Sequence, residues 1–216
     1  DIVIPAGPEN NITLDKEITI DGNGYEITRT FNTVDVGSGY GDSEAVFYVK
    51  AAGVTIKNVK MSGLAAGMKD EAAIFIAANG TADKKIVIEN CEFIGAGSVA
   101  AASGGSGIIS EGNTGAYLEV KDNTFTNVKH GMWFNGISNA IIDGNKLNGV
   151  KYTGIRVEAN SQNVTITDNT MTDVASANYA NDEFASGIWV GADSKVTLNN
   201  NSIALNAGAT NGKLVT

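Results

Sequence analysis

The chain has 216 residues, of which 43% are hydrophobic and 18% charged, and its formal net charge at pH 7 is −9. This composition predicts a folded protein with a sizeable core and excludes a disordered chain. The acidic balance also argues against nucleic-acid binding, which needs a basic face for phosphates.

Two further classes are excluded by simple counts. No apolar run approaches the roughly 20 residues of a membrane-spanning helix, so we expect no membrane insertion. The one cysteine excludes an internal disulfide, and the one histidine excludes a histidine-based metal cluster.

Residues 1–11 come before the repeats described below and carry no charged leader, so they do not resemble a signal peptide. We expect a single domain over residues 1–216, with 1–11 as an N-terminal edge or cap and 207–216 as a C-terminal edge. The chain is expected to be a piece of a longer or processed protein that has neighbouring domains.

Seven eight-residue segments align along the chain without gaps, at start-to-start spacings of 22 to 36 residues. They are ITIDGNGY from Ile18, VTIKNVKM from Val54, IVIENCEF from Ile86, LEVKDNTF from Leu118, AIIDGNKL from Ala140, VTITDNTM from Val164 and VTLNNNSI from Val196. The first and third positions are apolar, which is the alternation of a β-strand.

Three of the last four positions of these segments each have their own pattern. The fifth holds only Gly, Asn or Asp, residues that tolerate the left-handed conformation, so a tight bend is expected there. The sixth is Asn in five of seven segments, and stacked amides can hydrogen-bond along the stack. The eighth is large and apolar. These three columns read, in chain order, Gly22, Asn58, Asn90, Asp122, Gly144, Asp168, Asn200; Asn23, Val59, Cys91, Asn123, Asn145, Asn169, Asn201; and Tyr25, Met61, Phe93, Phe125, Leu147, Met171, Ile203.

A further short strand precedes most of the segments. These strands are 47–49, 74–76, 108–110, 132–134, 155–157 and 188–190. Each turn of chain then holds three strands, and the pattern predicts an all-β, right-handed parallel β-helix of about seven coils with an Asn ladder. From residue 12 to about 206 the chain resembles the pectin-lyase-like superfold. That fold hosts lyases, hydrolases, esterases, epimerases, phage tailspikes and non-catalytic surface proteins, so it specifies no activity.

The signatures of the polysaccharide-cleaving members are missing. Pectate lyases share a motif that contains Arg-Pro, but neither Arg29 nor Arg156 precedes a proline. Polygalacturonase-like hydrolases carry a Gly-His-Gly block, which Lys129-His130-Gly131 matches only in part. An inverting hydrolase would need two carboxylates facing one cleft. We expect His130 to be a hydrogen-bonding residue at the rim. Weak catalytic candidates, for a lyase-like cluster, are Lys129, His130, Arg156 and Glu158.

The middle residues of the preceding strands are predicted to point outward, because alternate side chains of a strand face opposite sides. They form an aromatic and apolar column that holds both tryptophans of the chain: Tyr48, Phe75, Ile109, Trp133, Arg156 and Trp189. A large exposed apolar patch typically marks an interaction site. We therefore expect ligand binding by Tyr48, Phe75, Trp133, Arg156 and Trp189. Two alternatives are burial beneath the inserts 62–71, 94–106 and 172–186, and a protein–protein interface.

Two other features receive structural interpretations. Cys91 stands in the sixth-position column beside Val59, and we expect a buried, inert thiol. The inserts are acidic, and we predict that their carboxylates form a solvated rim. The alternative is calcium binding, because that ion takes hard oxygen ligands. The residues concerned are Asp35, Asp42, Glu44, Asp70, Glu71, Asp173, Asp182 and Glu183.

The sequence favours a non-catalytic, extracellular or cell-surface β-helix module that presents an aromatic face for glycan binding or adhesion. Its expected partner is a polysaccharide or cell-surface glycan, with no nucleic acid, and no cofactor is expected apart from the calcium alternative. The alternatives are a divergent polysaccharide lyase or glycoside hydrolase, and a structural or oligomerising stalk.

Overall fold

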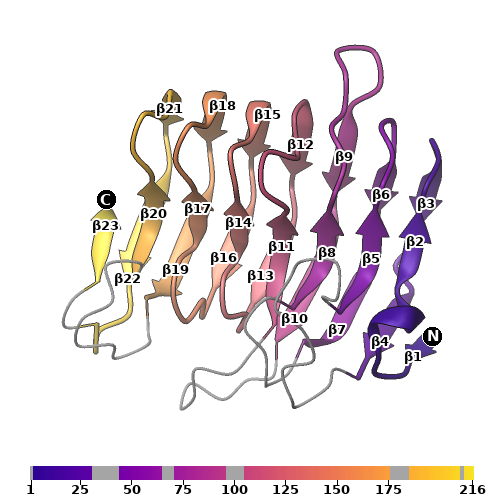
Figure 1. Cartoon of the computed structure of the whole chain (residues 1–216). Coiled ribbons are helices and arrows are strands. Elements are labelled where there is room, and N and C mark those ends of the chain that lie inside the picture. The colour runs from indigo at the N-terminus through magenta and orange to yellow at the C-terminus, as the bar shows by residue number, and fades with distance from the viewer. Residues whose placement is uncertain (1, 31–43, 65–70, 96–104, 176–184, 210–211) are drawn as a thin grey trace.

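The computed structural model describes residues 2–30, 44–64, 71–95, 105–175, 185–209 and 212–216. The chain winds into successive coils whose strands stack into three parallel sheets, as Figure 1 shows. The only helical element in these ranges is a short 3-10 turn, η1 (Pro8–Asn10). Within the same ranges, no helix has the length and hydropathy that a membrane crossing requires.

Each coil contributes one strand to each sheet. The first sheet holds β2 (Ile12–Leu14), β5 (Ala45–Val49), β8 (Ala72–Ile76), β11 (Ser106–Ser110), β14 (Met132–Phe134), β17 (Ile155–Val157), β20 (Ser186–Val190) and β23 (Lys213–Val215). The second holds β3 (Thr19–Asp21), β6 (Thr55–Lys57), β9 (Ile86–Glu89), β12 (Leu118–Lys121), β15 (Ser138–Asp143), β18 (Gln162–Thr167) and β21 (Val196–Asn199). The third holds β1 (Ile2–Ile4), β4 (Glu26–Arg29), β7 (Lys60–Leu64), β10 (Glu92–Gly95), β13 (Thr124–Thr126), β16 (Lys146–Asn148), β19 (Thr170–Val174) and β22 (Ser202–Leu205).

The core is a continuous column of apolar side chains between the three sheets. Phe93 and Phe125, from neighbouring coils, stack with ring centroids 4.4 Å apart. Like residues lie above one another because the register pairs equivalent positions, as in the Phe93–Phe125 and Leu147–Met171 pairs. The predicted fold is confirmed, and hydrophobic burial along this column stabilises it.

The predicted bend is confirmed in six of the seven repeats. The fifth-position residues Asn58, Asn90, Asp122, Gly144, Asp168 and Asn200 all have positive φ. The first repeat differs, because there the positive φ values belong to Asn23 and Gly24.

The alignment of the first repeat is therefore wrong by two residues. Ile27, rather than Tyr25, pairs with Met61 and takes the inward position. Tyr25 is 65% exposed instead of forming part of the core, while Ile27 is buried. The longer bend around Asn23 and Gly24 shifts the strand that follows it, which a gap-free alignment cannot show.

The Asn ladder is present in the C-terminal coils. The side-chain oxygen of Asn145 accepts hydrogen bonds from the backbone and side-chain nitrogens of Asn123, both at 3.0 Å. Asn145 donates in the same way to Asn169, and Asn169 to Asn201. Cys91 continues the stack only through its backbone nitrogen, which donates to Asn123. The ladder thus satisfies polar groups that would otherwise be buried without partners.

Candidate functional site

The predicted outward column is a real column on the outer face of the first sheet. The strand register aligns its members coil by coil: Tyr48 with Phe75, Phe75 with Ile109, Ile109 with Trp133, Trp133 with Arg156 and Arg156 with Trp189. Successive members are therefore about one strand spacing apart, roughly 4.8 Å.

The N-terminal half of this column is buried, which corrects the expectation of a continuous exposed stripe. Phe75 is 0% exposed, and it forms a second apolar cluster with Tyr48, Ile109 and two alanines. Tyr48 and Phe75 pack with ring centroids 5.5 Å apart. Burial of these apolar side chains is favourable, so in this half of the column the alternative of burial holds. The inserts named in that alternative, 62–71, 94–106 and 172–186, lie mostly outside the described residues.

Tyr48 is further fixed by polar neighbours. Its hydroxyl donates to Glu111 at 2.7 Å, and the ammonium of Lys50 lies 4.6 Å from the centre of its ring. Burial, followed by the contact with Glu111, raises the pKa of Tyr48 above its ordinary value. In this structure neither Tyr48 nor Phe75 offers an open ring to a ligand.

The C-terminal half of the column is partly exposed. The guanidinium of Arg156 lies between the two tryptophans, 4.5 Å from the ring centre of Trp133 and 5.2 Å from that of Trp189. Glu158 accepts a hydrogen bond from the indole nitrogen of Trp133 at 3.0 Å and forms an ion pair with Arg156. We call Trp133, Arg156, Glu158 and Trp189 the Trp–Arg site.

A second group lies beside this site, in the turns that lead into β14 and β17. The His130 ring stacks on Tyr152 at 5.3 Å and lies 5.5 Å from the ring of Trp133. The ammonium of Lys129 is 5.9 Å from the Tyr152 ring centre. Tyr152 was missed at the sequence level, because it lies outside the strand pattern and only its position in a turn one coil above Lys129 brings it here.

His130 is 4% exposed, so the expected rim position is wrong. Burial, then Lys129 and Arg156, hold the pKa of His130 well below its usual range, so the imidazole is neutral at pH 7. Within the part of the chain that the structure describes, its Nδ1 atom has no hydrogen-bond partner.

The four weak catalytic candidates thus lie close together, but two of them, Arg156 and Glu158, form an ion pair with each other. Arg156 is engaged with Glu158, and Lys129 and Arg156 act on His130 through their charge. A neutral imidazole can accept a proton, and Arg156 can attract a substrate carboxylate. The arrangement can therefore bind an anionic or hydroxyl-rich ligand, and it contains one potential base.

Two minor expectations can also be placed. Cys91 is 1% exposed, and burial raises the pKa of its thiol to about 11, as expected for an inert thiol. Of the acidic residues considered for calcium, Glu44, Glu71 and Asp173 lie in described ranges, and the other five do not. Among the described residues no group of three or more His, Cys, Asp and Glu side chains is placed to hold a metal ion.

Comparison with solved structures finds distant similarity to other β-helix proteins. A surface protein and adhesin of Streptococcus pneumoniae, PfbA, is 16% identical, with a TM-score of 0.45 over 92% of this chain and 68% of that one. A second structure of this adhesin gives a TM-score of 0.47 at 16% identity, over 95% of this chain and 62% of that one. An alginate lyase of a Paenibacillus species is 14% identical, with a TM-score of 0.44 over 90% and 70% of the two chains.

These likenesses are too distant to carry a functional argument, and no curated protein matches the sequence closely enough to count as a relative. The family model described as "Right handed beta helix region" matches residues 44–213, which is most of the chain. That match agrees with the three parallel sheets and the coil-by-coil register. The chain therefore belongs to the right-handed β-helix family.

Proposed function

We propose that this protein is a non-catalytic extracellular or cell-surface module that binds an extended glycan at the Trp–Arg site. The observation that carries the proposal is the placement of one guanidinium between two partly exposed indoles on three successive coils. Extracellular placement rests on the composition, which is acidic, poor in cysteine and built from a modular repeat.

The chemistry of the Trp–Arg site suits a sugar chain. Indole faces offer apolar surface to the C–H faces of sugar rings, and Tyr and Trp combine such surface with a polar edge. Glu158 and Arg156 supply an acceptor and donors beside the rings, in the pattern of apolar walls with a few placed polar groups that ligand sites show. Trp133 and Trp189 are two coils apart, so one extended chain can contact both.

The direct test is glycan binding by the variants Trp133→Ala, Trp189→Ala and Arg156→Ala, measured on a glycan array and then by calorimetry. Truncating an aromatic anchor typically costs about 2 kcal/mol or more, so we expect a loss of about 30-fold for each tryptophan. Arg156→Ala is expected to weaken acidic glycans more than neutral ones.

A matched control is Tyr25→Ala, since Tyr25 is an exposed aromatic residue that lies outside the site. It should leave binding unchanged. Wild-type binding by both tryptophan variants would refute the proposal. A fall of several degrees in the melting temperature of both would also count against it, because the rings would then be core.

A polysaccharide lyase is the second candidate, and the neutral His130 beside Tyr152 and Arg156 is the observation that favours it. Incubation with a panel of acidic and neutral polysaccharides, followed by assays for unsaturated ends and reducing ends, separates the two. The binding proposal expects neither product. Product formation by wild type that is lost in His130→Ala would establish the lyase instead.

A further inference from the structure

A buried charged cluster lies in the N-terminal coils, whereas the Trp–Arg site lies in the C-terminal coils. Arg29 and Glu44 are each 1% exposed and Glu71 is 5% exposed. Burying charged groups is costly unless they are paired and hydrogen-bonded. The cluster has no part in the proposed glycan site, so it requires its own explanation.

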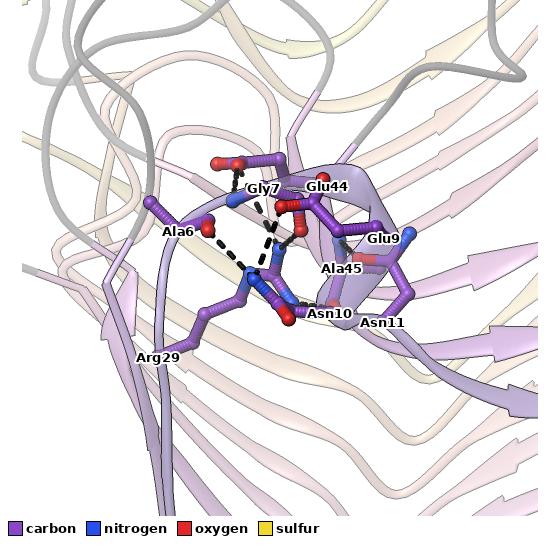
Figure 2. Close-up of polar contacts among 8 residues, drawn as sticks. All are labelled: Ala6, Gly7, Glu9, Asn10, Asn11, Arg29, Glu44 and Ala45. Carbon is purple, nitrogen blue, oxygen red and sulfur yellow. Dashed lines mark hydrogen bonds and ion pairs between the residues drawn. The ribbon is translucent and has the colours of Figure 1, made fainter.

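Arg29 and Glu44 hold the N-terminal segment in place, as Figure 2 shows. Arg29 donates to the carbonyl oxygens of Ala45 and Gly7, each at 2.7 Å, and lies 3.7 Å from the Glu44 carboxylate. The Gly7 nitrogen donates to Glu44, and the Ala45 nitrogen donates to the side chain of Asn11 at 2.9 Å. These contacts fix residues 7–11 against the strand β5 that follows Glu44.

Glu71 lies directly above Glu44 in the next coil. The register pairs Ala45 with Ala72, and the Ala72 nitrogen donates to the Glu44 carbonyl at 3.3 Å. After burial and the charge of Glu44, a side-chain hydrogen bond with Glu44 is the third cause that raises the pKa of Glu71. An ionised carboxylate only accepts hydrogen bonds, so such a contact requires a proton on one member of the pair. Among the described atoms, Glu71 Oε2 has no hydrogen-bond partner of its own.

Other charges act on this pair from neighbouring elements. Glu9, from η1, acts on Arg29, and Lys129, from the turn before β14, acts on Glu71. The coil between Glu71 and Lys129 has Gly105 at the stacked position, which places no side chain between them. Burial, followed by Glu44, raises the pKa of Glu71 to about 8, while Arg29 and Lys129 oppose the rise.

We propose that Glu71 is protonated at neutral pH, and that its proton makes the cluster a pH-sensitive latch for the N-terminal segment 7–11. With the proton present, one guanidinium balances one carboxylate, and Arg29 keeps its hydrogen bond to the Gly7 carbonyl. Without it, two buried carboxylates lie in successive coils near one guanidinium. Their repulsion is relieved when residues 7–11 open and admit water to the cluster.

The sign of the pH effect follows from linkage. The folded-state pKa of Glu71, about 8, lies above its ordinary value of 4.5. The unfolded state therefore loses the proton first as the pH rises. The contribution of Glu71 to folding stability is fully present below pH 4.5 and is lost as the pH rises through about 8. The latch is thus closed in acid and opens in mild alkali.

The wild-type protein provides the first test. In an NMR titration of the side-chain carboxyl carbons, we expect Glu71 to titrate above neutral pH. We also expect the Gly7 amide to lose protection from hydrogen exchange over the same range, beyond the loss seen for amides of the central core. A Glu71 midpoint near 4.5, or Gly7 protection that is unchanged up to pH 9.5, would overturn the proposal.

The variant Glu71→Gln provides the second test, since a glutamine amide can donate permanently to Glu44. Its Gly7 protection and its melting temperature should no longer change between pH 6 and pH 9 as they do in the wild type. Glu92→Gln, on the exposed face of β10, is the control and should keep the wild-type pH dependence. Persistence of the transition in Glu71→Gln would refute the latch. If that variant does not fold, the wild-type titration decides alone, and glycan binding enters neither test.

Discussion

The two halves of one strand column differ in environment although they share the same register. In the N-terminal coils Tyr48, Phe75 and Ile109 are buried in a second apolar cluster, whereas in the C-terminal coils Trp133, Arg156 and Trp189 are partly exposed. Strand alternation therefore determines which way a side chain points, but not whether solvent reaches it. The neighbouring residues decide that: alanines beside Phe75, and charged partners beside Trp133.

The same two regions also differ at the inner bend. The C-terminal coils carry the amide ladder from Asn123 to Asn201, while Val59 and Cys91 occupy this position in the coils below. In the C-terminal coils, stacked hydrogen bonds satisfy the buried polar groups at the bend. In the coils of Val59 and Cys91, apolar side chains fill the same space. Substitutions in each region should therefore fail for different physical reasons.

The largest expected effect is that of Phe75→Ala. Phe75 is fully buried, so the change removes a large apolar side chain and leaves a cavity. Such changes cost about 3–5 kcal/mol of unfolding free energy. Chemical denaturation of the variant measures it, with Tyr25→Ala as the exposed aromatic control. A cost below about 1 kcal/mol would show that the N-terminal half of the column is open in solution.

The next effect is that of Asn145→Ala in the ladder. The change removes the acceptor of the Asn123 backbone nitrogen and one of the two acceptors of its side-chain nitrogen. It also removes a donor to the Val120 carbonyl. We expect a loss of about 1–3 kcal/mol. Asn199→Ala, at an exposed position on β21, is the control and should be nearly neutral. Equal melting temperatures for Asn145→Ala and wild type would show that the ladder does not stabilise the fold.

The repeat pattern was enough to predict the coils, the bends and the ladder, because each depends on local residue type at a fixed spacing. It misplaced Tyr25, because the longer bend moves the following strand by two residues and the residue types in the aligned segment give no sign of this shift. It could not show the burial of Phe75 or His130, which depends on which side chains pack beside them in the folded chain. Nor could it find the Glu44–Glu71 pair, because these residues lie 27 positions apart and meet only through the coil register.

A smaller effect is expected from Trp189→Ala, the counterpart of Phe75→Ala in the open half of the column. Trp189 is partly exposed and contacts the Arg156 guanidinium, so truncation should cost about 1 kcal/mol of stability or less. The comparison between halves predicts that Phe75→Ala loses stability and Trp189→Ala loses glycan binding. If denaturation gave the two variants similar losses, the halves would not differ as described.

The smallest effect is expected from Cys91→Val. The side chain is buried at a position that Val59 fills in the coil below, so the site accommodates a valine of similar volume. The stabilising contact of Cys91 with the ladder comes from its backbone nitrogen, which the substitution keeps. Its sulfur makes only weak contacts with the carbonyl oxygens of Ile56 and Glu89, at 3.7 and 3.3 Å. We therefore expect a change within about 0.5 kcal/mol and unchanged glycan binding, because volume-conserving swaps between apolar residues cost little. Denaturation and binding assays on the one variant test both statements. A folded Cys91→Val protein that had lost its function would give the thiol a role that neither its burial nor its raised pKa explains.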